Sequence, residues 1–236
     1  MVSGNPTFPL RTAALAAIIL TALASGAASA ANCSASAAPG VDWTECDKKL
    51  IILSGADLNG ATLVGTDFTS TDLRDTNLMT ANLEKATLVR ASLAGAKAEG
   101  AKFDRIEAYR TNFSGIHAQG ATFASAEMQR SNFTDAVLVN VNFTKAELGR
   151  ADFTGADITG TKFALANLAR ADFSKAKFSG PIDFANAFLF LTRIEGVDLS
   201  AATGLAQWQV DMACGDANTK LPAGLTAGKS WPCAFD

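Results

Sequence analysis

The sequence predicts an all-β fold, a four-sided β-solenoid whose chain winds through coils of twenty residues. Three observations lead to this prediction. An apolar or small residue returns at every fifth position from Leu53 to Phe178, arginines return every twenty residues from Arg90, and phenylalanines return every ten residues from Phe103. Such internal repeats are the mark of a stack of similar units. For the 236-residue chain we therefore predict one elongated domain rather than a set of separate helices and strands.

The five-residue period fits a short strand followed by a corner. The series from Leu53 to Phe178 has 26 positions, and 23 of them hold Leu, Phe, Ile or Met. On an α-helix, a period of five advances the apolar residue by about 140° each time, so no face stays apolar. On a flat strand, an odd period alternates between the two faces. Within one unit, however, a second small residue lies two places upstream, on the same strand face. Each unit therefore forms one side of a coil.

Longer periods set the number of sides. One set of arginines recurs every twenty residues, and it comprises Arg90, Arg110, Arg130, Arg150 and Arg170. One set of phenylalanines recurs every ten residues, and it comprises Phe103, Phe113, Phe123, Phe133, Phe143, Phe153, Phe163 and Phe173. A twenty-residue coil places the arginines on one corner and the phenylalanines on two opposite walls, whereas a fifteen-residue coil would scatter both sets. Four sides are therefore predicted.

The units themselves resemble those of a known family. The stretches ADLNG, ANLEK, ADFTG and ADFSK are similar to the A-(D/N)-L-x-x units of pentapeptide repeat proteins. The resemblance covers residues 51–202 and implies a right-handed quadrilateral β-helix, but no single biochemical activity. The C-terminal stretch ACGDANTKLPAGL…WPC also resembles an end module of exported members of this family in proteobacteria.

The N-terminus has the pattern of a secretory signal peptide. Arg11 precedes about a dozen mostly apolar residues, and Ala28-Ser29-Ala30 follows them. The apolar run is too short to span a bilayer. We therefore predict a signal peptide over residues 1–30 and a mature chain that starts near Ala31, without a transmembrane segment. The expected location is periplasmic or secreted, in a bacterium.

The remaining segments divide into a repeat region and two caps, because open solenoid ends expose unpaired strand edges. We predict an N-terminal cap over 31–50, the β-helix over 51–202 and a C-terminal cap over 203–236. The repeat slips by one residue at 179–181, where Pro181 favours a bulge.

Each cap contains a tryptophan that we expect to cover one end of the rod. At the N-terminal end, Trp43 is predicted to cover the first coil. At the C-terminal end, Thr203 is predicted to cap a short helix that ends at Gly215. That helix would place Leu205, Trp208 and Met212 on one apolar face.

Four cysteines flank the repeats in two local groups, Cys33 with Cys46 and Cys214 with Cys233. An even number of cysteines in an exported protein favours disulfides. We prefer the two local pairs, and the other two connectivities stay open. A zinc site is the alternative, but neither group has metal-ligand spacing or a nearby histidine. Asn32 also does not fit the position before a lipid-bearing cysteine.

The sequence offers no catalytic apparatus. Its one histidine, His117, is expected to point outward, and no glycine-rich phosphate loop opens a helix. We predict no catalytic residue, cofactor or metal, and no enzyme activity. The formal net charge is −3, or −4 without Arg11, which is too small to indicate nucleic-acid binding.

A set of polar residues precedes the central apolar positions, and its short side chains are expected to bond to nearby backbone. The set includes Asp57, Asn77, Asn82, Asn112, Asn132, Asn142, Asp152 and Asp172.

The five arginines, here called the arginine column, exceed what the repeat requires. One interpretation is structural: Glu107, Glu127 and Glu147 each precede a column arginine by three residues and would pair with it. The other is functional: the column is a candidate interaction surface for a polyanion of the cell envelope.

The leading functional hypothesis is an exported, non-enzymatic scaffold whose partner, an unknown protein or an envelope polyanion, the sequence does not identify. Its oligomeric state also stays open. The family resemblance implies an alternative, since some members mimic duplex DNA and protect DNA gyrase from quinolones. The signal peptide, the cysteines and the basic corner argue against that alternative, and we expect no nucleic-acid partner.

Overall fold

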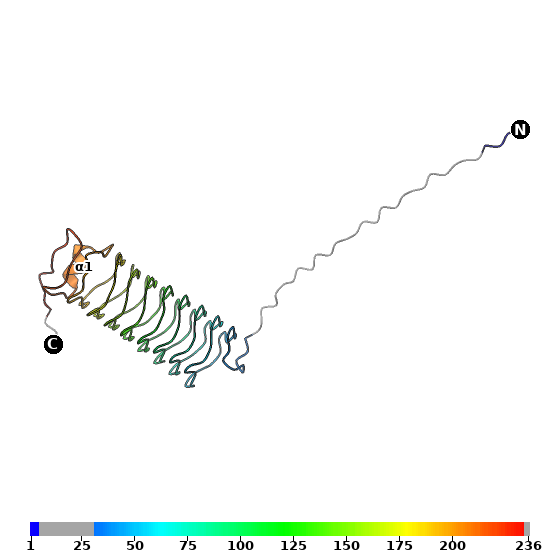
Figure 1. The fold of residues 1–236 in the computed structure, drawn as a ribbon, viewed down its shortest axis with the longest axis horizontal. Helices are drawn as coiled ribbons and strands as arrows, with labels where there is room; N and C mark the ends of the chain where they lie inside the picture. Colours follow the sequence, from blue (N-terminus) through cyan, green and yellow to red (C-terminus); the bar gives the residue numbers. More distant parts are fainter. Residues whose placement is uncertain (5–30, 234–236) are drawn as a thin grey trace.

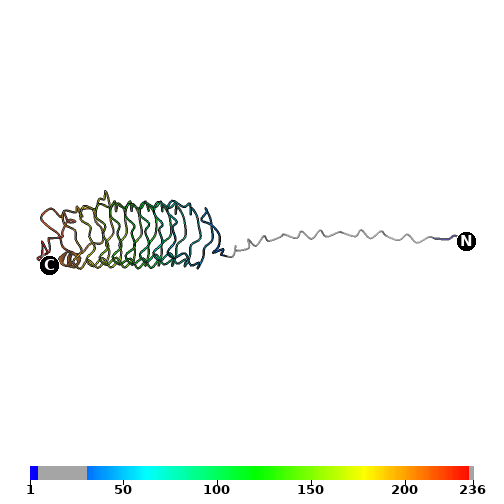
Figure 2. The same ribbon diagram turned by 90° about the horizontal axis from the view of Figure 1, so that it is seen from below.

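The computed structural model describes residues 1–4 and 31–233, and residues 31–233 form a rod of stacked coils (Figure 1). Seen from a second direction, the coils follow one another along the rod in sequence order (Figure 2). Apart from its first four residues, the predicted signal peptide lies outside the described part. Within that part, helical structure is confined to α1 (Gln207–Met212), at the C-terminal end of the rod. This helix is too short to cross a bilayer, and no other candidate span occurs among the described residues.

Parallel β-bridges between residues twenty apart hold the coils together. Asn112 bridges Asn132, which in turn bridges Asp152 on the next coil. Four such bridges occur per coil, one in each five-residue unit, and each is an isolated bridge rather than part of a longer strand. The amide of Phe133 donates to the carbonyl of Asp152 at 2.7 Å, and the same pattern recurs along the rod. The predicted twenty-residue coil therefore matches the spacing of the bridges.

A tight turn follows each side. At one corner the amide of Ala151 donates to the carbonyl of Leu148 at 2.9 Å, and Arg150 between them has φ +61°. A positive φ at the second central residue alone is the signature of a type II turn, in which glycine is favoured because it lacks a Cβ. Every fifth residue therefore occupies a left-handed conformation, whatever its side chain.

The phenylalanines fill the interior as two interlocking columns. Phe113 and Phe133 stack on consecutive coils with ring centroids 4.8 Å apart, and Phe123 meets Phe133 edge to face at 6.1 Å and 89°. Both arrangements suit the charge distribution of aromatic rings. All the phenylalanines from Phe103 to Phe173 in this set are buried. The prediction of two facing aromatic walls is therefore confirmed.

The Asp and Asn residues of the bridge positions bond to their own corners, as predicted. In Asn132, for example, Oδ1 accepts from the amide of Thr134 at 2.8 Å. The same contact, two residues along the chain, occurs for all eight of the predicted residues. These side-chain contacts stabilise the turns.

The regular pattern starts upstream of residue 51. Bridges join Asp42 to Thr62 and Asp47 to Asp67, so the first coil includes part of the segment predicted as a cap. Trp43 lies in phase with the repeat and is only 1% exposed. It is therefore a core residue of the first coil rather than a lid above it.

Near the other end, the bridge spacing changes where the repeat slips. Asp157 bridges Lys177 at the normal spacing of twenty, whereas Lys162 bridges Asp183 and Asn167 bridges Phe188 at twenty-one. The extra residue is absorbed between 178 and 183, in agreement with the predicted slip at 179–181. Stacking then continues into the C-terminal cap, where Arg193 bridges Cys214.

The prediction for the C-terminal helix is wrong in its limits and in its buried face. The helix starts after Ala206, not Thr203, and Ala213, not Gly215, follows its last residue. Trp208 is 49% exposed, whereas Gln209 is completely buried. Apolar periodicity therefore misjudged which side of α1 faces the rod.

Gln209 explains this orientation. Its Nε2 donates to the carbonyls of Phe184 at 2.8 Å and Ala187 at 2.9 Å, and its Oε1 accepts from the amide of Ala206 at 2.8 Å. A buried amide with satisfied donors and acceptor costs little, whereas unpaired carbonyls at the rod end would be costly. Gln209 thus gives the carbonyl of Ala187 the donor that the backbone of a further coil would otherwise provide, and it gives the carbonyl of Phe184 a second donor beside the amide of Ala187.

Candidate interaction surface

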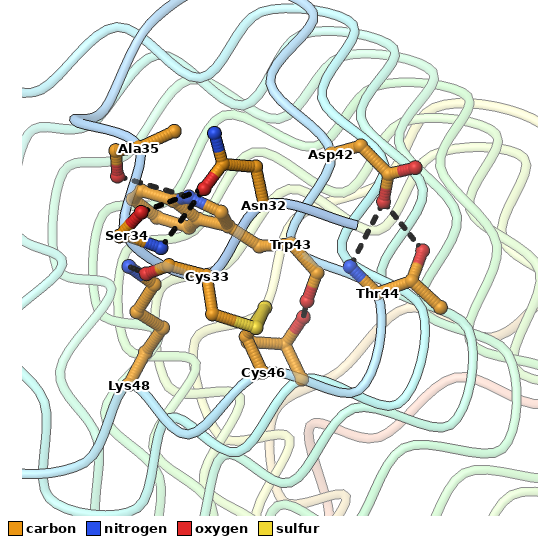
Figure 3. The surroundings of a disulfide bond; sticks show 10 residues. Asn32, Cys33, Ser34, Ala35, Asp42, Trp43, Thr44, Cys46 and Lys48 are labelled. Carbon is orange, nitrogen blue, oxygen red and sulfur yellow. Dashed lines mark hydrogen bonds between the residues drawn. A yellow bond between two sulfur atoms is a disulfide. The ribbon is translucent and has the colours of Figure 1, made fainter. Parts of the chain in front are cut away.

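The N-terminal disulfide joins Cys33 to Cys46, with Cα atoms 5.3 Å apart, as the local pairing predicts. Figure 3 shows its surroundings. Lys48 Nζ donates to the carbonyl of Cys33 at 2.8 Å and lies 3.8 Å from the centre of the Trp43 ring. Burial lowers the pKa of Lys48. The indole Nε1 of Trp43 donates to Ala35 at 3.2 Å. These contacts hold the segment around Cys33 against the first coil, which indicates a structural role for the disulfide and its neighbours.

The C-terminal disulfide joins Cys214 to Cys233, with Cα atoms 5.4 Å apart. Beside it, the indole Nε1 of Trp231 donates to the carbonyl of Ala213 at 2.6 Å, and the ring packs over Gly215. A hollow of about 270 Å³ lies next to this ring. It is lined by Asp216, Ala217, Ala227, Gly228, Trp231 and Pro232. This mainly small and apolar lining offers no group of reactive side chains.

The sequence predicted no catalytic or metal-ligating residue, and His117 was the one histidine to place. His117 is exposed on a flat side, as predicted. No set of three or more His, Cys, Asp or Glu side chains in residues 1–4 and 31–233 could hold a metal ion.

The arginine column lies along one corner of the rod. Its five members have φ between +56° and +61°, and all are exposed. The bridges on either side of the corner stack the coils in register, so each arginine follows the one before it along the rod axis. Neighbouring bridged strands lie about 4.8 Å apart, which brings successive arginine backbones close together.

The predicted ion pairs within this column are wrong. None of the ion pairs and side-chain hydrogen bonds among the described residues involves a column guanidinium. Glu147 instead accepts from Asn167 Nδ2 on the next coil at 2.8 Å. The glutamates occupy bridge positions on the flat side, whereas the arginines leave the chain at the corner. Arg110 does have an aromatic neighbour, because its guanidinium lies 5.2 Å from the centre of the Tyr109 ring.

Ion pairs on other parts of the rod do perturb titration. The guanidinium of Arg74 donates to Asp72 and, with the Arg74 amide, lowers the pKa of that carboxyl to about 2. At the other end, hydrogen bonds from Lys220 and Ser200 lower the pKa of Asp198 to about 2. The Asp72–Arg74 pair lies within one turn, whereas the Asp198–Lys220 pair joins residues 22 apart in the chain. They therefore show where charges on this surface are compensated, in contrast to the arginine column.

The column is also unusual in its choice of corner residue. Among the four sets of left-handed corners, it is the one that contains no glycine in the described residues. The opposite corner, by contrast, is mostly glycine. Its members are Gly40, Gly60, Thr80, Gly100, Gly120, Asn140 and Gly160. The fold thus accepts glycine at such corners, yet the corner of the arginine column carries long cationic side chains.

Comparison with solved structures finds several repeat proteins of low similarity. HetL, from the cyanobacterium Nostoc sp. Strain PCC 7120 and involved in regulating heterocyst differentiation, is 22% identical, with 84% of this chain and 92% of HetL covered and a TM-score of 0.34. QnrB1, a plasmid-mediated fluoroquinolone resistance protein, is 26% identical over 73% of this chain and 86% of its own, with a TM-score of 0.49. A thylakoid-lumen protein from Arabidopsis thaliana is 25% identical, with coverages of 47% and 67% and a TM-score of 0.24. Such superpositions carry no functional argument.

The search of curated proteins gave no match. The family model described as pentapeptide repeats matches in overlapping segments with eight copies, at residues 51–88, 76–115, 109–144, 119–155 and 146–180. These segments span residues 51–180, which is more than half of the chain. With its five-residue units, its twenty-residue bridges and this match, the chain belongs to the pentapeptide repeat family.

Proposed function

We propose that this protein is an exported, non-enzymatic scaffold, a right-handed quadrilateral β-helix that binds a polyanion through the arginine column. The observation that carries the proposal is the column itself: five exposed guanidinium groups in line, with no acidic partner among the described residues. Guanidinium groups bind phosphates and carboxylates through paired hydrogen bonds. A polymer of such anions could meet several arginines at once.

Backbone strain supports a role for these side chains. A residue with a Cβ in the left-handed conformation costs roughly 1 kcal/mol relative to glycine. Like charges on successive coils add repulsion that no ion pair offsets. The fold therefore gains nothing visible from arginine at these five corners. A bound polyanion would remove the repulsion.

The adjoining corner adds to the positive character of this region. It carries Lys85, Arg105 and Lys145, each five residues before a column arginine. Of these, Arg105 is paired with Glu84 at 2.6 Å. A surface of this sign argues against the DNA-mimic alternative, in which the rod would have to present negative charge.

To test this proposal, the changes Arg110→Gln, Arg130→Gln and Arg150→Gln are combined, and binding to heparin and to inorganic polyphosphate is measured. If each exposed contact contributes roughly 0.5 kcal/mol, the triple variant should bind about tenfold more weakly at low salt. High salt should reduce the difference. The matched control combines Lys97→Gln, Lys177→Gln and Lys229→Gln, which removes the same charge from other parts of the surface and should have little effect.

A glycine version of the triple variant separates binding from folding. Changing the same three arginines to Gly should also abolish the extra affinity, but it should raise the free energy of unfolding by roughly 0.5–1 kcal/mol per corner. If the glycine variant instead loses stability and polyanion binding is unchanged, the column is structural and the proposal fails.

Export is a separate part of the proposal. It is supported by the signal-peptide pattern of residues 1–30 and by two disulfides, which form in oxidising compartments. Mass spectrometry of the protein from bacterial cells should find a mature N-terminus near Ala31, in the periplasm or the medium. A protein that keeps Met1 and remains in the cytosol with free thiols would contradict export.

A further inference from the structure

An exposed apolar patch lies at the C-terminal end of the rod, beside the last arginines. We call it the apolar end patch, and it consists of Leu165, Phe188, Phe190 and Trp208. Their exposed fractions are 51%, 44%, 44% and 49%, and the rings of Phe188 and Phe190 stack at 6.2 Å. Phe188 and Phe190 flank the inward-facing Leu189, so both rings must leave the flat side of the coil.

Hydrogen bonds place the members of this patch on successive levels. Phe188 bridges Asn167, and the amide of Leu165 donates to the carbonyl of Ala185 at 2.8 Å. On the coil that would come next along the rod, α1 occupies the position above residues 187–191. There Gln209 donates to the carbonyl of Ala187, and the carbonyl of Met212 accepts from the amide of Leu191. The patch therefore continues from the last regular coils onto the helix.

The patch adjoins the arginine column directly. The amide of Arg170 donates to the carbonyl of Phe190 at 2.8 Å, so these two residues are neighbours across the coils. Arg150 lies one coil further from the end. Neither guanidinium has an ion-pair partner among the described residues. Aromatic side chains thus border two uncompensated positive charges.

Three acidic groups at this end of the rod are already engaged. Glu147 accepts from Asn167 at 2.8 Å, Asp211 accepts from Gln207 at 2.9 Å, and Asp183 accepts from the amide of Ala185 at 2.8 Å. Earlier on the same side of the rod, the bridge positions are acidic or polar, including Asp67, Glu107 and Glu127. The change from polar to aromatic side chains is confined to the C-terminal end.

We propose that the apolar end patch, together with Arg150 and Arg170, docks onto the surface of an anionic phospholipid bilayer. This inference rests on the proposed function and names the polyanion: the array of lipid phosphates in a membrane leaflet. Tryptophan and phenylalanine side chains insert at the boundary between headgroups and acyl chains, and arginines beside them bind the phosphates. Each basic residue near such a surface contributes attraction that salt weakens.

Charge favours the bilayer over a second copy of this chain. A symmetric contact between two copies, centred on the patch, would bring Arg170 of one copy close to the same residue of the other. Juxtaposed like charges oppose such a contact. An anionic leaflet meets both the apolar and the basic halves of the surface.

The test uses the mature full-length protein and vesicles sedimented from solution. Binding is compared between vesicles of phosphatidylcholine alone and vesicles that also contain phosphatidylglycerol. We expect binding to the anionic vesicles alone, with a loss of at least tenfold for Phe188→Ser combined with Phe190→Ser, and a similar loss for Arg150→Gln combined with Arg170→Gln. Met79→Ser, which removes another exposed apolar side chain, at 39% exposure, is the control and should bind normally.

A second measurement locates the contact. Quenching of tryptophan fluorescence by brominated lipids should occur in the parent protein and fall sharply in Trp208→Phe, because Trp43 is buried and Trp231 is partly buried. Unchanged quenching in this variant would overturn the proposed contact.

The remaining outcomes separate this inference from the proposed function. Binding to heparin and polyphosphate without binding to anionic vesicles overturns the membrane inference and leaves the arginine column as a polyanion site. Loss of both overturns both. A dimer in solution that dissociates when Phe188 and Phe190 are changed to Ser, without vesicle binding, would identify a second copy as the occupant and also overturn the membrane inference.

Discussion

Replacing Phe153 with Ala is expected to lower the free energy of unfolding by about 3–5 kcal/mol. Phe153 is completely buried near the middle of the aromatic columns. Its ring stacks on Phe133 at 5.1 Å and on Phe173 at 4.8 Å, and meets Phe143 and Phe163 edge to face at 6.0 and 5.7 Å. The backbone bridges above and below hold the wall in place, so it cannot collapse around the missing ring. The substitution therefore leaves a cavity inside the rod.

Chemical denaturation followed by circular dichroism measures this effect. The matched control is Phe188→Ala, because that ring is 44% exposed and its loss should cost clearly less. A stacked repeat protein can lose cooperativity when one coil is weakened, so the slope of the transition is compared as well as its midpoint. Equal losses for the two variants would contradict the interior placement of Phe153.

Replacing Gly204 with Ala is expected to lower the free energy of unfolding by roughly 2–4 kcal/mol, mainly at the C-terminal end. Gly204 has φ +68°, and an added Cβ would lie 2.6 Å from the amide nitrogen and 2.7 Å from the Cα of Ala185. Both contacts are to backbone, which cannot rotate away as a side chain could. Since Gly204 lies two residues before the N-cap of α1, relieving the clash would move the helix off the last coil.

Gly55→Ala is the matched control for this prediction. Gly55 has a similar φ of +70°, but no other atom lies within 4 Å of its added Cβ. It should therefore show the backbone strain alone, roughly 1 kcal/mol. Thermal unfolding compares the global stabilities, and limited proteolysis reports on the C-terminal cap. If the two variants are equally stable and equally resistant to protease, the close approach of Gly204 to Ala185 is not a constraint.

The periodic features of the molecule could be predicted from the sequence. A repeated unit has nearly the same environment in every coil. Each copy of the unit therefore gives separate evidence for which of its side chains point inward. This redundancy is why the aromatic walls, the twenty-residue coil and the bonds from residues such as Asn132 to their own turns were predictable. The local cysteine pairs could be predicted for another reason, because short separations in the chain and an oxidising compartment favour such disulfides.

Features that depend on a single contact were not predictable in this way. The glutamates lie three residues before the column arginines in sequence, yet they occupy a flat side while the arginines leave a corner. Proximity along the chain therefore did not produce ion pairs. No sequence signal separates these cases, because pairing depends on the direction in which each side chain leaves the coil.

The C-terminal end shows the same division most clearly. The sequence by itself determined that the repeat stops, that a short helix follows and that cysteines flank the rod, because the loss of periodicity and the residue types are local properties. The tertiary structure decided that Gln209, rather than Trp208, faces the last coil. The physical reason is that the carbonyl of Ala187 has no backbone donor among the described residues, and the buried Gln209 amide donates to it as well as to the carbonyl of Phe184. The same choice leaves Trp208 at the surface.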